Sequence, residues 1–409
     1  MPREPASPTA VLSIRWRRGA RSPTLQLVVV VRPVSKFSVV AFMLGPGLAW
    51  AGPLDESAEF EGGSEATSIG LGWLFEGANR VDVEGEALLG GDITVLRTTV
   101  AYEQRRGEIT LGATFGYTDI DIDYSPRTVT FPADRRESNR QAQIDLSWKA
   151  TPAIELTGLV RGYEGFPDYR SVWIAEYYEQ LFGFVPGYRD ADPAGWALGA
   201  GAAWDLVPGT TRINFNLGYG EDEIVEGWSF GIGGLTSGRQ RLETTSGGAT
   251  WLQVIRGWLK METSIRFQEI TDRESRFQGQ TNLAAALGPD WTLRVNAGAT
   301  RERPSFEAHF VGVMVDYEFL PGWHVAVNSR YYEDSGEIES YGFSTAAPGL
   351  QAYELGASIL YDKDDFAVRL YGGFYNTDFE PLTSTNNFFG NLYRDRDWWV
   401  TRIAVSYSF

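Results

Sequence analysis

Cysteine is absent from this chain of 409 residues, and only two histidines occur, His309 and His324. A chain without cysteine forms no disulfide, no thiol nucleophile, no cysteine-ligated zinc site and no covalently attached haem. Two histidines are too few for a histidine-rich metal centre. The sequence therefore predicts no cofactor and no bound metal.

Long hydrophobic runs are also missing. No uninterrupted apolar stretch approaches the roughly eighteen residues that a membrane-spanning helix needs, so any membrane interpretation has to rest on strands. Glycine and aromatic residues are abundant instead. The chain contains 46 Gly, 14 Trp, 19 Tyr and 23 Phe, spread along its length. This composition is typical of a β-barrel rather than of a helical protein.

Residues 1–51 differ from the rest, because they hold seven basic residues and a single acid. Lys36, an apolar stretch and the small-residue end Ala49-Trp50-Ala51 predict a secretory leader that is cleaved after Ala51. The alternative is a short buried strand or helix. Without these residues, 29 basic and 52 acidic groups remain, a net charge of −23, which argues against nucleic acid as a partner.

From residue 66 onward the chain alternates apolar and polar residues with a period of two, which predicts strands. The segment from Leu259 to Phe267 is a clear case. We expect residues 66–409 to form a single all-β domain, an antiparallel transmembrane β-barrel of 16–18 strands, preceded by 52–65 as a short periplasmic segment or first strand. The strands are predicted near 66–76, 80–89, 92–103, 108–119, 139–150, 153–163, 194–206, 210–219, 241–255, 258–270, 277–287, 291–302, 306–319, 323–333, 351–361, 366–376 and 397–409.

Tight turns alternate with long polar connections along this series of strands. Pro208-Gly209 and Pro321-Gly322 are examples of the turns, and 164–193 and 334–350 are examples of the connections. Such barrels have short turns on the periplasmic side and longer loops outside. Tryptophans flank several of the tight turns and predict an aromatic girdle at that membrane interface: Trp148, Trp204, Trp258, Trp291 and Trp323.

The segment Asp397 to Phe409 continues the period-two pattern to its last residue, with Trp399, Tyr407 and Phe409 on one face. It resembles the C-terminal strand of Gram-negative outer-membrane β-barrel proteins of the porin type. The resemblance implies a place in the outer membrane, among bilayer lipids and lipopolysaccharide. It also implies that the barrel-assembly machinery reads Tyr407 and Phe409 as its signal.

The predicted inner face of the strands carries arginines and carboxylates at many levels. Because a guanidinium group stays charged, repeated inward arginines indicate water or carboxylate partners inside the barrel, and a barrel of this size has room for an aqueous channel. Either these charges select solutes, or they form ion pairs in the wall without a role in selection. The candidate pore-lining residues are Arg97, Arg161, Arg212, Arg266, Arg294, Arg330, Arg369, Arg402, Asp145, Glu155, Glu262 and Glu354.

The connection 164–193 is long and aromatic. In place and length it resembles the porin loop that folds into the lumen and narrows it, although the PEFGG sequence of that loop is missing. The alternative is a surface loop that packs on its own aromatic residues. The candidate constriction residues are Tyr169, Arg170, Trp173, Tyr177 and Tyr178.

The function predicted from these features is passive or weakly selective diffusion of small hydrophilic solutes across an outer membrane. The first alternative is a non-conducting barrel, used as a scaffold for a partner or as an adhesin. An outer-membrane enzyme is a weaker alternative, because His309 with the nearby Ser305 lacks the motifs of barrel hydrolases. We therefore predict no catalytic activity, while monomer and homo-oligomer both stay open.

Overall fold

The computed structural model describes residues 10–15, 26–31, 80–122, 135–166, 172, 193–225, 229–231, 234–236, 239–271, 275–302, 306–336, 348–363, 365–381 and 395–408. The chain divides into two units, Met1–Ser38 and Val39–Phe409. In the first unit, β1 (Ala10–Arg15) and β2 (Gln26–Val31) form an antiparallel pair. The predicted segment 52–65 and strand 66–76 lie outside the described residues, and cleavage of the leader stays a prediction.

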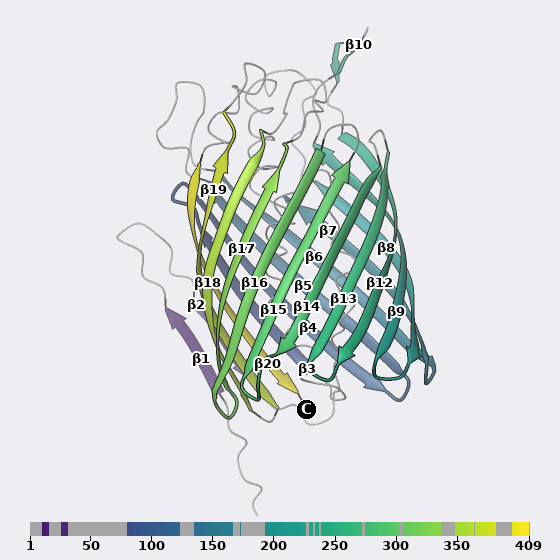
Figure 1. Ribbon diagram of the computed structural model, residues 1–409. Helices are drawn as coiled ribbons and strands as arrows, with labels where there is room; N and C mark the ends of the chain where they lie inside the picture. The colour runs from purple at the N-terminus through teal and green to yellow at the C-terminus, as the bar shows by residue number, and fades with distance from the viewer. Residues whose placement is uncertain are drawn as a thin grey trace, which may run out of the picture. The chain divides into compact units, whose positions relative to one another are not determined.

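The described part of the second unit is a closed antiparallel barrel of sixteen strands (Figure 1). A separate short pair, β10 (Ser229–Gly231) with β11 (Gly234–Thr236), lies in the connection between β9 and β12. The barrel strands are β3 (Arg80–Leu89), β4 (Ile93–Arg106), β5 (Ile109–Ile122), β6 (Arg135–Thr151), β7 (Ile154–Gly165), β8 (Ala194–Val207), β9 (Thr211–Val225), β12 (Arg239–Arg256), β13 (Leu259–Ile270), β14 (Arg276–Ala286), β15 (Trp291–Glu302), β16 (Phe306–Leu320), β17 (Trp323–Asp334), β18 (Leu350–Lys363), β19 (Phe366–Phe379) and β20 (Arg396–Ser408).

The ring closes where β20 pairs with β3, for example at Val400 opposite Leu88 and at Ser406 opposite Asp82. Each barrel strand therefore has a hydrogen-bonded neighbour on both sides, and the barrel has no exposed edge. The predicted all-β antiparallel barrel is confirmed, and the strand number falls within the expected 16–18.

Period-two alternation places one face of each strand outside and the other inside. On β20, Trp399 is 64% exposed whereas the next residue, Val400, is 2% exposed. The outer face is a continuous surface of exposed Val, Leu, Ile, Phe, Tyr and Trp side chains, which suits lipid rather than water. The five girdle tryptophans are 37% to 51% exposed and lie at or beside the tight turns, as predicted.

The two ends of the barrel differ in their connections. At one end, here called the tight-turn end, short turns join the strands, as at Gly107-Glu108 and Pro321-Gly322. At the other, the long-loop end, the connections include 166–193 and 335–349, and shorter connections occur there as well, for example the turn at 90–92. This distribution matches the prediction. In the described ranges, no helix is long and apolar enough to cross a membrane.

Two glycines of the tight turns provide a matched test of backbone strain. Gly209 and Gly322 both have positive φ, 74° and 76°. A Cβ on Gly322 would collide with the backbone carbonyl of Asp362, whereas a Cβ on Gly209 would meet open space. We expect Gly322→Ala to lower the free energy of unfolding by about 1–3 kcal/mol more than Gly209→Ala, which adds only the conformational cost. Urea unfolding followed by tryptophan fluorescence measures both, and equal losses would contradict the collision.

Candidate functional site

All twelve candidate pore-lining residues lie on the inner face of their strands, opposite in parity to the exposed apolar residues. Arg402, for instance, follows the outward Thr401 and precedes the outward Ile403. Their role in permeation stays a prediction. Tyr407 is on the outer face and 42% exposed. Outside the described residues lie Phe409 and the candidate constriction residues Tyr169, Arg170, Trp173, Tyr177 and Tyr178.

The first charged cluster crosses the seam between β3 and β20. Glu86 accepts a hydrogen bond from Nε of Arg402 and another from Arg97, whose Nη1 lies 3.3 Å away. The guanidinium of Arg402 also lies 5.1 Å from the centre of the Tyr371 ring. Tyr371 in turn donates its hydroxyl to Glu354 at 2.5 Å. The contacts thus join five lumen side chains, two arginines, two glutamates and one tyrosine, into one network.

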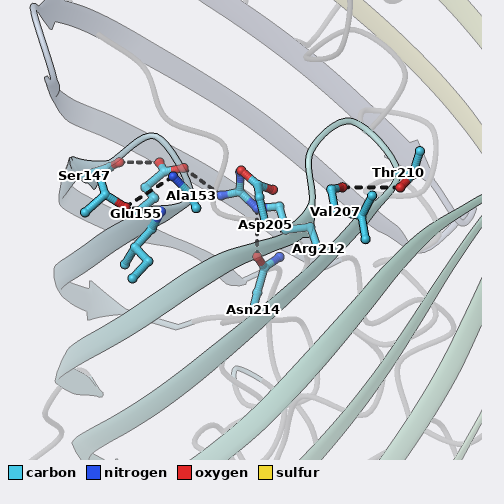
Figure 2. Close-up of polar contacts among 10 residues, drawn as sticks. Ser147, Ala153, Glu155, Asp205, Val207, Thr210, Arg212 and Asn214 are labelled. Atoms are coloured by element: carbon cyan, nitrogen blue, oxygen red, sulfur yellow. Dashed lines mark hydrogen bonds and ion pairs between the residues drawn. The ribbon is translucent and has the colours of Figure 1, made fainter.

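The second charged cluster lies at the tight-turn end, on β6 to β9 (Figure 2). Glu155 accepts hydrogen bonds from the Ser147 hydroxyl and from Nη2 of Arg212, the latter at 2.6 Å. Arg212 donates a further bond to Asn214 at 3.0 Å, and its Nη1 lies 3.9 Å from Asp205. In a ring of sixteen strands, β7 stands eight places from β17, so these two strands lie on opposite walls of the barrel.

A third group of charges lies on the wall from β15 to β19 and includes Glu84 on β3. Arg369 interacts electrostatically with Arg294, Asp316 and Glu84. Asp316 also lies 3.0 Å from Nδ1 of His324. His309, by contrast, is on the outer face, where its Nε2 lies 3.4 Å from Glu333. The two histidines therefore lie on opposite faces of the wall.

Other functional candidates were missed by reasoning from the sequence. Glu86 and Asp82 share the inner face with Arg402, and the period-two pattern of 80–89 places them there. Arg276, 1% exposed, pairs with Glu302 through bonds of 2.8 Å and 2.6 Å. It was missed because the predicted strand began one residue later, at Phe277. Arg396, which bonds Asp92 at 3.1 Å, was missed for the same reason.

The long-loop half of the lumen contains a packed apolar cluster that the charge pattern did not predict. We call it the lumen cluster. It joins inward residues of β3 to β5 and β16 to β20 to two residues of the 166–193 connection, Phe166 and Val172, both fully buried. This connection therefore reaches the inner wall at Val172. The remaining members are Leu88, Ile93, Val95, Ile120, Ile122, Phe306, Ala308, Tyr332, Leu350, Ala352, Tyr371, Tyr375, Trp398 and Val400.

The wall away from the lumen cluster is more accessible, and small or uncharged polar residues stand there beside the charged ones. On β8 the inward residues are Gly195, Ala197, Gly199, Gly201 and Ala203. The middle of β14 and β15 presents half-buried carboxamides instead. The lumen thus has an apolar and a polar side.

Comparison with known proteins shows similarity in fold but no related sequence. No protein family and no curated protein sequence matches the chain. CdiB from Acinetobacter baumannii is similar in structure, with a TM-score of 0.50 and 10% identity over 81% of this chain, which spans 60% of the CdiB chain. Two further structures have lower TM-scores. A bacterial polysaccharide outer-membrane secretin has a TM-score of 0.49 and 9% identity, and the match covers 82% of this chain and 99% of the secretin chain. The Pseudomonas putida toluene transporter TodX has a TM-score of 0.41 and 13% identity, and the match covers 82% of this chain and 90% of the TodX chain.

Three observations indicate the same fold: the closed ring of sixteen strands, the apolar outer face with its girdle, and the structural similarity to CdiB. A sequence identity of 10% shows a shared fold and nothing about function. The chain has the fold of the outer-membrane β-barrel proteins.

Proposed function

We propose that this protein is a channel of a Gram-negative outer membrane through which small hydrophilic solutes diffuse passively or with weak selectivity. The observation that carries the proposal is the contrast between the two faces of one wall. The outer face is apolar and exposed, whereas the inner face combines interleaved arginines and carboxylates with half-buried amides and hydroxyls. Such an inner face needs water, and a barrel of this strand number is wide enough to hold it.

The partners in this proposal follow from the outer face and the last strand. Bilayer lipids contact the girdle and the rest of the apolar outer face, and lipopolysaccharide contacts that face toward the long-loop end. The barrel-assembly machinery reads the aromatic row of β20 that contains Trp399 and Tyr407. Both aromatic residues point outward and are exposed, which supports this assignment. No catalytic step is part of the proposal.

One observation favours the alternative of a non-conducting barrel. The lumen cluster packs Val172 and Phe166 against the walls of the long-loop half, and such packing narrows the space left for water. A barrel closed in this way would serve as a scaffold or display its loops. Conductance separates the two functions.

The test is single-channel recording of the full-length protein, purified from membranes of an expressing Gram-negative host, in planar bilayers. We expect stable conductance steps in KCl, and the reversal potential in a salt gradient reports whether arginines or carboxylates dominate selectivity. Correct insertion is checked by heat-dependent mobility on gels. An inserted barrel that carries no current would overturn the channel proposal and favour the scaffold.

A further inference from the structure

Four carboxamide side chains occupy the middle of the lumen wall on two adjacent strands. Gln278, Gln280 and Asn282 are successive inward residues of β14, and Asn296 is opposite Asn282 on β15. All four are partly exposed. We call this surface the amide wall.

Most side chains of the amide wall make no hydrogen bond to another described residue of the protein. Within the described part of the chain, the side chains of Gln278, Gln280 and Asn296 make no hydrogen bond, and Asn282 bonds Glu262. Some other lumen amides are used internally: Gln143 donates to Asp145 at 2.9 Å, and Asn139 donates to the Gly165 carbonyl at 2.9 Å. Three amides of the wall are therefore available to a passing solute.

Several charged groups of the lumen are engaged with one another. Glu86 lies between Arg402 and Arg97, Glu155 binds Arg212, and Arg276 binds Glu302. A solute ion that passes these pairs would have to compete with a partner already in place. Eight strands round the ring from β14 and β15, the inner face presents neutral hydroxyls, Thr99 on β4 and Thr114 on β5.

From these contacts we infer that the amide wall selects uncharged, polyhydroxylated solutes of sugar size over ions of the same size. The inference rests on the proposed channel function and names its substrate class. A carboxamide offers two donors and a carbonyl acceptor without charge, and a hydroxyl is both a donor and an acceptor. A sugar therefore exchanges water for amide partners one for one, whereas an ion gains no counter-charge from the amides for the hydration that it loses.

The test compares three probes that differ mainly in charge: glucose, gluconate and glucosamine. Efflux of each radiolabelled probe is measured from proteoliposomes that contain the full-length protein, with KCl on both sides. Wild type is expected to release glucose several-fold faster than either ion. Gln280→Met with Asn296→Leu keeps side-chain volume and removes the amides, so the glucose advantage is expected to fall toward one.

Gln143→Met is the matched control, because it removes a lumen amide that is already bonded to Asp145, and it is expected to keep the wild-type ratio. Equal efflux of the three probes from wild type, or an unchanged ratio in the double variant, overturns the inference. If the double variant does not insert, Gln278→Met alone replaces it. KCl conductance is recorded first: its absence refutes the channel itself, whereas conductance with equal efflux refutes only the selectivity.

Discussion

Replacing Glu86 with alanine is expected to lower the free energy of unfolding by about 3–5 kcal/mol, because it removes the carboxylate that two arginines share. The Glu86 side chain is 9% exposed and that of Arg402 is 12% exposed, so water replaces little of what is lost. The contact also joins β3 to β20, the pair that closes the ring. Urea unfolding in lipid vesicles, followed by the fluorescence of the 14 tryptophans, measures the change.

Glu84→Ala is the control for this effect. Glu84 is the preceding inward residue of β3 and is only partly buried, and within the described residues it makes no ion pair or hydrogen bond. Its replacement is expected to cost less than about 1 kcal/mol. If the two variants lose the same stability, Glu86 does not hold the seam together and the loss reflects only the removal of a carboxylate.

Replacing Val172 with aspartate is expected to raise single-channel conductance several-fold. Val172 is fully buried in the lumen cluster, and a carboxylate placed among those side chains costs several kcal/mol unless it reaches water. The contact between the 166–193 connection and the inner wall is therefore lost, and more of the lumen fills with water. Planar-bilayer recording measures the effect.

The added charge alone could change conductance, and Ala197→Asp controls for this. Ala197 is on the inner face of β8, partly exposed and outside the lumen cluster, so the same carboxylate there disturbs no packing. We expect it to shift cation preference with little change in conductance. A Val172→Asp channel that conducts like wild type would mean that the lumen cluster does not limit flow.

The strands of the barrel were predictable because the wall separates two environments, and side chains alternate between them with period two. Leu259 to Phe267 shows this pattern without interruption, and the structure places β13 there. Sixteen of the seventeen predicted segments correspond to barrel strands, and the remaining one, 66–76, lies outside the described residues. The orientation of the turn-flanking tryptophans was predicted for the same reason.

The arrangement within the lumen was only partly predictable. Parity places Arg402 inside, but it does not say that Glu86, over three hundred residues away in the chain, is its partner. That pairing depends on the register of β20 against β3, which a single strand does not encode. The lumen cluster was missed because apolar inward residues such as Ile120 and Trp398 are isolated exceptions in the sequence of each strand. Only the packing of different strands in the barrel brings them into one cluster.

The seam between β3 and β20 also sets the order in which this protein can fold. The side-chain contacts across it, from Arg396 to Asp92 and from Ser406 to Asp82, join residues separated by 304 and 324 positions. Every other pair of neighbouring barrel strands is consecutive or nearly so in the chain, so hairpins can form locally while this one contact waits for the whole chain. Contacts between residues so far apart in the chain form slowly. The edge of β3 therefore stays unpaired until β20 has been synthesised and must be protected from pairing with other strands. Folding of the barrel cannot be completed during synthesis.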